Sequence, residues 1–549
     1  LYPSLAFFVS ALGVNLFGEG LRRLVKKGLL QLRRLVNRYT LVVLLMCALA
    51  FHFGQWETGS MLFYRRLASQ FDSGRVMKQI ETLTSPAFDE RALGSQGMDQ
   101  AADYIASQFS SCDLQAAGTN YTYFATHERT FESLDETPQL SIGDSAADLR
   151  YLRDYTVFAG MYRNVGKIEG EVVFLATGEL TETVQGKVPA LAGMDFSQDI
   201  LLLPSPATAN ALEDLRVPIG GMLVIADDDS ALNRRVTLSG QDRSFFLTLI
   251  SNNAPPPDDY PKLLITKAVA DRILASSGNS LRDLSDTAKA LEKDEIVVVP
   301  TGVSSSMEIK ATVHERMPVR DVIGYIPGTL AGEAISKQGL ALDNHMIVVM
   351  AQYDSPPSSP DGTPFPGAND NASGVGIMLE AIRTMQESDY KPYKTFLFVA
   401  YSGEGSEGGN DVRKPDPSQF LRAAAFFSSS YKIEATIRLR GLGAGDGRGL
   451  ALFSPGNLRL VHLFEDAAQR MGLRAQPVDD AMDMSVVFAG KTARDSGQES
   501  PDITLSWQGW ERTSRTPSDT VDTISQTKIE KAGRALALAL MILGRETNY

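Results

Sequence analysis

The 549-residue chain is poor in cysteine and histidine. It contains two cysteines, and Cys47 lies inside an apolar run, so Cys112 has no partner for a disulfide in the rest of the chain. The five histidines are His52, His127, His314, His345 and His462. The sequence also has no internal repeat and no long low-complexity tract, although residues 356–366 form a loop rich in Pro, Ser and Gly.

Positive charge is scarce outside the first 38 residues. The whole chain has 53 basic and 66 acidic residues, and residues 39–549 retain 46 of the basic and 65 of the acidic ones. An acidic surface repels phosphates, which disfavours nucleic-acid binding and direct adhesion to an anionic membrane. With nearly 500 residues, this part of the chain is long enough for two domains.

Apolar runs and helical patterns alternate through the C-terminal half of the chain. The runs near 346–351, 395–401, 435–439 and 449–453 predict buried strands. Helices are predicted at 371–383, 418–427, 458–471 and 529–543. This alternation predicts an α/β fold with a mixed central sheet sandwiched by helices, in which a site forms at the carboxyl ends of strands.

Four motifs in this half hold residue types suited to a functional site. They read Gln-Tyr-Asp-Ser at 352–355, Gly-Ala-Asn-Asp-Asn-Ala-Ser-Gly at 367–374, Ser-Gly-Glu-Gly at 402–405 and Arg-Thr-Pro-Ser-Asp-Thr at 515–520. In their order and spacing they resemble the M28 family of two-zinc aminopeptidases and carboxypeptidases. The ligands in that family are His, a bridging Asp, Glu, Asp and His. The resemblance implies an M28 peptidase-like domain formed by residues 72–149 and 291–549.

Most of the implied metal ligands are substituted in this chain. The resemblance puts the bridging aspartate on Asp370, whereas Gln352, Gly405, Arg440 and Arg515 stand at the other four ligand positions. A catalytic zinc needs about three protein ligands from His, Asp, Glu or Cys, and a guanidinium repels a cation. We therefore expect no metal cofactor. A buried carboxylate that loses its metal needs another positive partner, so Arg440 or Arg515 is predicted to pair with Asp370 or Glu404.

Three further residues bear on the implied site. Asp354 matches the aspartate that follows the first ligand in the family and does not itself bind the metal. Glu404 matches the general base, here vestigial because no metal-bound water is expected for it to activate. The alternative for Glu404 is an ordinary loop charge between two glycines. His345 lies seven residues before Gln352 in the sequence, an odd separation that points it to the opposite strand face, as an ordinary strand histidine.

Residues 150–290 differ from the rest in being rich in β-patterns and proline. Strands are predicted at 170–175 and 222–226, and the segment 262–266 precedes a short helix. The pattern resembles the protease-associated domain that is often inserted in M28 proteins. The resemblance implies a lid or a protein-interaction surface, and a merely structural insertion is the alternative.

The first 56 residues predict a membrane anchor. The chain begins with Leu rather than Met, so we expect it to be the tail of a longer polypeptide. Residues 1–18 form an apolar span, and the segment 15–22 resembles the end of permease subunits of dipeptide and oligopeptide ABC importers, with a generic anchor as the alternative. Residues 19–38 predict a basic amphipathic helix, and 39–56 a second span with aromatic residues at both ends. The seven basic residues between the spans are expected to stay in the cytoplasm. The two spans then form a multi-pass anchor in the cell membrane, and the large domain is predicted to lie on the extracytoplasmic side.

Three functions are compatible with these residues. In the first, an inactive peptidase-like domain binds peptides or a partner beside other subunits of a peptide importer, with Arg440 and Arg515 available for a peptide carboxylate. In the second, the chain is an active zinc-dependent aminopeptidase with unrecognised ligands. In the third, it is a structural scaffold with a salt-bridged relic of a site.

Overall fold

The structure is a computed structural model of residues 1–549. It describes residues 59–546 except 89–90, 144–148, 159–163, 179–190, 192, 216, 227–246, 251–259, 276, 294, 330–344, 389, 403–431, 455–456 and 479–501. The chain divides into two compact units, Leu1–Tyr64 and Arg65–Tyr549, and the fold described here is that of the second.

The predicted membrane anchor lies outside the described residues. This applies to both spans, 1–18 and 39–56, and to the basic segment 19–38 between them. The predicted helix 418–427 also lies outside the described residues. Within the ranges that are described, no helix combines the length and the apolar character that a membrane span requires.

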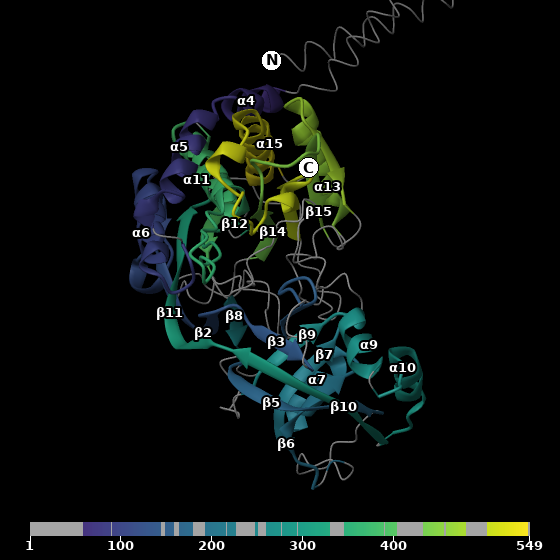
Figure 1. The fold of residues 1–549 in the computed structure, drawn as a ribbon. Helices are drawn as coiled ribbons and strands as arrows, with labels where there is room; N and C mark the ends of the chain where they lie inside the picture. The colour runs from purple at the N-terminus through teal and green to yellow at the C-terminus, as the bar shows by residue number, and fades with distance from the viewer. Residues whose placement is uncertain are drawn as a thin grey trace, which may run out of the picture. The chain divides into compact units, whose positions relative to one another are not determined.

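The first sheet has ten strands (Figure 1). They are β1 (Gln115–Ala116), β2 (Phe124–Leu134), β8 (Leu247–Ile250), β11 (Ala311–Ile326), β12 (His345–Gln352), β13 (Thr395–Tyr401), β14 (Lys432–Leu439), β15 (Gly449–Phe453), β16 (Arg474–Pro477) and β17 (Asp502–Trp507). Their order is β16-β15-β17-β14-β12-β13-β11-β2-β8, with β1 paired to β11. The centre β13-β12-β14-β17 is parallel, whereas β15 on one side and β11 on the other join it antiparallel. The sheet is therefore mixed, and the four predicted strands are confirmed.

Strand β12 is the centre of this sheet and positions the candidate site at its end. Residues 346–351 are wholly buried, as expected of a parallel strand covered on both faces. On one face Met346, Val348 and Met350 pack with Leu397 and Val399 of β13.

Among the described residues, five helices accompany the sheet. They are α5 (Ser73–Leu83), α6 (Gln96–Ser111), α11 (Ser373–Gln386), α13 (Leu458–Arg470) and α15 (Gln526–Arg545), and a further helix, α4 (Gly59–Ala68), precedes them. Helix α11 packs on β12 and β14 and contacts α5 and α15, while α6 packs on β11. Side chains of Asp72, Ser95 and Asn457 cap α5, α6 and α13 by accepting backbone N–H bonds. The predicted helices 371–383, 458–471 and 529–543 are confirmed as α11, α13 and α15.

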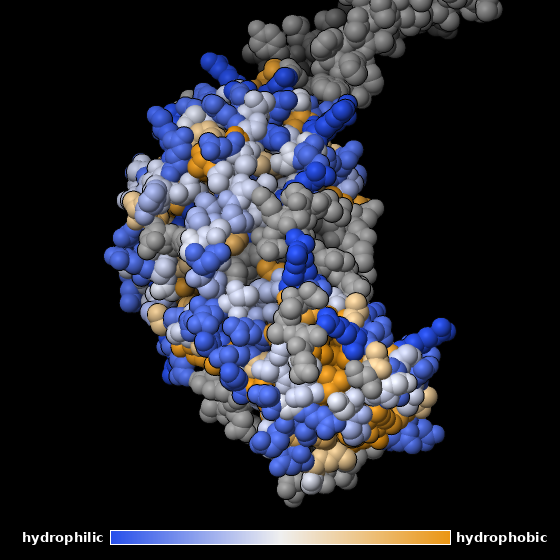
Figure 2. Space-filling model, in the orientation of Figure 1, coloured by the Kyte–Doolittle hydropathy of each residue, from blue (hydrophilic) through white to orange (hydrophobic). Residues whose placement is uncertain are grey.

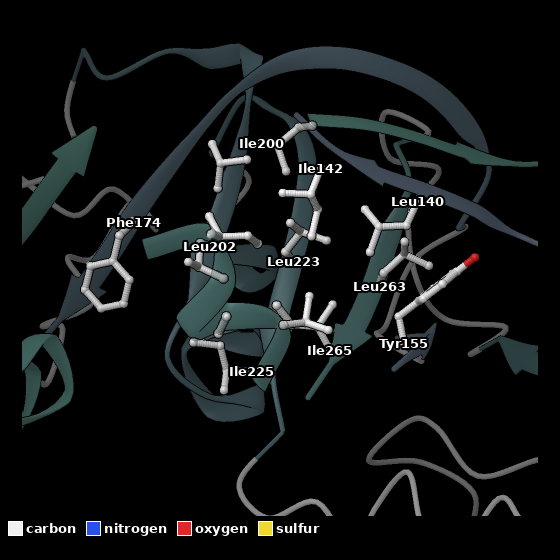
Figure 3. Packing of buried hydrophobic residues seen from close by; sticks show 14 of the residues in the cluster. Leu140, Ile142, Tyr155, Phe174, Ile200, Leu202, Leu223, Ile225, Leu263 and Ile265 are labelled. Carbon is white, nitrogen blue, oxygen red and sulfur yellow. The ribbon is translucent and has the colours of Figure 1, made fainter. Parts of the chain in front are cut away.

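The second sheet has seven strands in the order β3-β10-β5-β6-β7-β9-β4. The strands are β3 (Gln139–Ile142), β4 (Tyr155–Val157), β5 (Gly166–Thr177), β6 (Phe196–Leu203), β7 (Ile219–Ile225), β9 (Lys262–Ile265) and β10 (Ile296–Ile309). The helices are α7 (Pro206–Leu215), α9 (Lys267–Ala275) and α10 (Leu281–Ala290). Figure 3 shows side chains from six of these strands packed into one core, to which α9 and α10 also contribute.

The second sheet takes strands from beyond the predicted insert 150–290. Strand β3 precedes residue 150, and β10 follows residue 290. The long β10 pairs along the whole length of β5 and also with β3, so both β3 and β10 belong to this sheet. Strand β8 lies inside the predicted range but pairs with β2 of the first sheet. The strands predicted at 170–175 and 222–226 are present as parts of β5 and β7. The segment 262–266 contains β9, and the short helix predicted after it is α9.

A chain of four buried polar residues links the two sheets. Glu132 of β2 accepts a hydrogen bond from the backbone N–H of Asn164 at 2.7 Å, and Asn164 Oδ1 accepts from the backbone N–H of Lys262 at 2.6 Å. The Lys262 ammonium then pairs with Glu213 of α7 at 2.6 Å, and both of these side chains are fully buried. Because each member has a partner, this polar chain is compatible with an apolar core.

Figure 2 shows hydrophilic side chains over much of the described surface in this view, with apolar side chains gathered mainly over the second sheet and its helices. Among the described residues the large apolar side chains that are exposed are Leu62, Tyr121, Val298 and Leu458.

Candidate functional site

The turn that holds Asp370 lies between β12 and α11. Gly367 opens it with φ +62, and a Cβ there would lie 2.8 Å from the Asp370 carbonyl oxygen, so glycine is required. The Asp519 carboxylate accepts the backbone N–H groups of Asn369 at 2.7 Å and of Asp370 at 3.0 Å. Both carboxylates are buried, with exposures of 5% for Asp370 and 0% for Asp519. The turn is thus held by the tail motif, from far along the chain.

Two side chains of the turn, Asn369 and Asn371 on either side of Asp370, form hydrogen bonds with the end of β14 and the segment that follows it. Asn369 Oδ1 accepts the N–H groups of Gly443 and Ala444, both at 2.8 Å. Asn371 Nδ2 donates to the carbonyl of Leu439 at 2.8 Å and to that of Gln352 at 3.2 Å. The turn therefore joins the ends of the neighbouring strands β12 and β14. Sequence reasoning missed these two roles, although the Asn-x-Asn spacing of the motif was the signal for them.

Arg440 forms an ion pair with Asp370. Its Nε donates to Oδ1 at 3.0 Å and its Nη2 to Oδ2 at 3.4 Å, while Ser514 also donates to Oδ2. The guanidinium carbon lies 5.0 Å from the ring centre of Trp510, a cation–π arrangement. The two charged side chains are only 6% and 3% exposed. The predicted replacement ion pair is confirmed for Arg440 and Asp370.

The other predicted site residues lie in different settings. Gln352 ends β12, and because Ala351 pairs with Leu439, Gln352 and Arg440 are the next neighbours across the two parallel strands. Asp354 is buried beyond it. Arg515 is half-buried with φ +59, next to Ser514. Glu404 and Gly405 lie outside the described residues.

His345 is remote from this group. It begins β12, at the end opposite to Gln352, and its Nδ1 lies 2.9 Å from Glu434 Oε2. It is an ordinary strand histidine, as predicted.

Arg91 is a component of the site that the sequence did not reveal. Its guanidinium is buried, and it donates to the carbonyls of Tyr353 at 2.8 Å and of Pro366 and Gly367 at 3.1 Å each, and also to that of Leu83. Burial lowers the pKa of Arg91 to about 10, while the nearby charges of Asp354 and Asp519 oppose the shift. Arg91 thereby joins both ends of the 353–367 loop. No sequence pattern marks it, because all of these partners are main-chain groups.

Residues 334–540 match the sequence model of peptidase family M28. This part of the chain is an M28 peptidase-like domain, called the M28 domain below. The chain is also similar in structure to an aminopeptidase from Aneurinibacillus sp. strain AM-1, with a TM-score of 0.56 and 17% identity over 88% of this chain and 97% of that one. A peptidase M28 precursor from Shewanella amazonensis SB2B gives a TM-score of 0.51 and 15% identity over 89% and 97%. At these identities the likeness concerns the fold.

Zinc does not fit the described residues of the M28 domain. In the part of the chain that the structure describes, no group of three His, Cys, Asp or Glu side chains could hold a metal ion. The carboxylate of Asp370 is already bonded to Arg440 and Ser514, and Gln352 offers a neutral amide where a strong zinc ligand is needed. Asp370, Arg440 and Ser514 instead hold one another by an ion pair and hydrogen bonds.

The pKa of Asp519 is raised from its ordinary value to about 7. Burial is the main cause and the charge of Asp370 adds to it, whereas the two backbone hydrogen bonds and Arg91 oppose the shift. The folded protein therefore retains this proton in a pH range where the unfolded chain, with a carboxyl pKa near 3.8, has lost it.

We expect Asp519→Asn to flatten the pH dependence of stability. Since the folded state binds the extra proton, the wild-type free energy of unfolding falls by about 1.4 kcal/mol per pH unit from this one group as pH rises through 5 and 6, and the variant lacks that contribution. The measurement is urea unfolding at steps from pH 4.5 to 8, followed by tryptophan fluorescence. Parallel curves for the two proteins would contradict the raised pKa.

Proposed function

We propose that this chain is a membrane-tethered peptidase M28 domain that binds peptides or a partner without hydrolysing them. The observation that supports this is the position of Arg440. Its guanidinium occupies the surroundings of Asp370, the one ligand position that retains a carboxylate, at 3.0 Å. A cation that is part of the chain takes the place that a metal ion needs.

The same ion pair changes which ligands the site is able to bind. Arg440 is committed to Asp370 and nearly buried, so its contribution to a ligand is indirect. Arg515 is the more exposed of the two arginines, and a guanidinium is suited to bidentate binding of a carboxylate. We therefore assign Arg515 to the carboxylate of a peptide ligand and Arg440 to the support of the Asp370 turn.

The membrane part of the proposal depends on the sequence. The apolar segments 1–18 and 39–56 flank seven basic residues, which places the M28 domain outside the cell membrane. The permease-like segment 15–22 supports association with other subunits of an ABC peptide importer, which makes those subunits and peptides the proposed partners.

The competing proposal is an active, metal-dependent aminopeptidase that trims peptides at the membrane surface. It draws on the M28 domain itself and on the aminopeptidase named among the structural neighbours. It requires a set of ligands other than the one that the motifs indicate, because guanidinium and amide groups stand at those positions.

Metal content separates the two proposals. Full-length protein, extracted from membranes in detergent, is saturated with zinc and manganese, freed of excess metal and analysed by mass spectrometry. We expect a molar ratio near zero. A ratio of one or two would favour the aminopeptidase, and recovery of the protein without detergent would argue against the membrane spans.

Restoring the ligands tests the assignment of positions. The quadruple variant Gln352→His, Gly405→Glu, Arg440→Asp and Arg515→His is expected to bind zinc, because it returns the ligand types that the family uses. Adding Asp370→Asn to this variant should weaken zinc binding again by removing the bridge. A folded quadruple variant that stays free of metal would show that the positions are wrongly assigned.

A further inference from the structure

Gln352 lies where the strand order of the first sheet changes direction. Strand β12 has β13 on one side and β14 on the other, both parallel to it. In open sheets of this kind, ligands bind outside the carboxyl ends of the strands at such a point. Gln352 ends β12, and Arg440 directly follows β14 in the neighbouring position. Gln352 is therefore placed at the carboxyl end of a central parallel strand, where folds of this kind bind their ligands.

The side-chain oxygen of Gln352 is buried and accepts no hydrogen bond among the described residues. The residue as a whole is 9% exposed. Its backbone carbonyl accepts a hydrogen bond from Asn371 Nδ2 at 3.2 Å. Native proteins pair nearly all of their buried polar atoms, so an unpaired acceptor at the carboxyl end of a central strand is explained by a donor that comes from outside the chain.

The charges around Gln352 restrict what that group is. Its neighbour Arg440 is paired with Asp370, so the two charges beside the amide compensate each other. A charged ligand group buried here would need a counter-charge of its own, whereas a neutral donor needs only the acceptor. The N–H of a peptide bond is a neutral donor, and its carbonyl matches the NH₂ of the glutamine amide.

We propose that Gln352 binds a backbone amide in the interior of an extended peptide, so that the M28 domain recognises the peptide away from its charged ends. The inference rests on the proposed function, because it presupposes that the site binds peptides. Beyond the proposed function, it specifies that the interior backbone of the peptide is recognised and that Gln352 recognises it. Terminal recognition through Arg515 then adds affinity without being required.

The test compares two mixtures of hexapeptides randomised at every position. One mixture is acetylated and amidated, so it has no charged ends, and the other has free termini. Each is incubated with immobilised full-length protein in detergent, and the retained peptide is quantified by mass spectrometry. Gln352→Met removes the amide with little change in volume, and Gln352→Leu is the second variant if the first is unstable by thermal unfolding.

Thr436→Val is the matched control. Thr436 lies on β14, is wholly buried, and its Oγ1 also has no hydrogen-bond partner among the described residues, but it precedes Arg440 by four positions and lies away from the strand end. We expect the wild type and Thr436→Val to retain the capped mixture equally, and the Gln352 variant to retain at least tenfold less.

The remaining outcomes separate this inference from the proposed function. If the Gln352 variants retain the capped mixture as well as the wild type does, the inference is wrong while peptide binding stands. If the wild type retains only peptides with free termini, recognition occurs at the ends and the inference is also wrong. If the wild type retains neither mixture, peptide binding itself is refuted.

Discussion

Replacing Arg440 by leucine is expected to lower the free energy of unfolding of the M28 domain by about 3–5 kcal/mol. The substitution leaves the Asp370 carboxylate, whose side chain is 3% exposed, without a positive partner in a buried setting. Removing one member of a buried ion pair costs far more than removing both, because the remaining charge is uncompensated. Urea unfolding followed by tryptophan fluorescence measures the effect, since Trp507 and Trp510 both lie near this site.

A second variant shows whether the buried charge is the cause. In the double variant Asp370→Asn with Arg440→Leu no charge is left unpaired, so we expect it to recover a large part of the lost stability. Arg534→Ala serves as the control for the loss of an arginine, because its pair with Glu530 on α15 is partly exposed and contributes less than about 1 kcal/mol. A single Arg440→Leu variant as stable as the wild type would refute the role assigned to the ion pair.

Replacing Arg91 by methionine is the second substitution with a large expected effect, a loss of about 3–5 kcal/mol. Methionine fills a similar volume but leaves the carbonyls of Tyr353, Pro366 and Gly367, and that of Leu83, without their donor. It also removes the positive charge that acts on Asp354 and Asp519. Hydrogen exchange of residues 353–367, read together with urea unfolding, measures both the global and the local consequence.

Arg91→Lys distinguishes charge from hydrogen-bond geometry. An ammonium keeps the charge but does not reach carbonyls on several sides as a guanidinium does. We therefore expect an intermediate loss, with faster exchange in the 353–367 loop than in the wild type. If the lysine variant matches the wild type in both measurements, the hydrogen bonds to the loop are not what Arg91 contributes.

Several features of the M28 domain followed from local sequence. The run at 346–351 is apolar at every position because β12 is buried on both faces, and the same reasoning identified β13 and β15. The helical spacing after residue 371 correctly identified α11. An ion pair of Arg440 or Arg515 with Asp370 or Glu404 was predicted, since a buried carboxylate without a metal requires a cation, and the structure shows the pair of Arg440 with Asp370.

Other features were beyond the reach of local patterns. The extent of the second sheet depends on β3 and β10, whose residues alternate like those of many exposed strands, and only their pairing assigns them to one sheet. The predicted membrane spans and the role of Glu404 concern residues outside the described part of the chain, and they remain predictions.

The sequence by itself determined the α/β class and the principal strands and helices of the M28 domain. It also determined that a buried carboxylate such as Asp370 needs a positive partner. Each of these depends on residue type or on a short sequence period. Only the tertiary structure decided that Arg91 holds the loop, that Asp519 holds the turn and that the buried side-chain oxygen of Gln352 accepts no hydrogen bond among the described residues. These are contacts between residues far apart in the chain, often with main-chain groups. Burial and distance, rather than residue identity, set their energies.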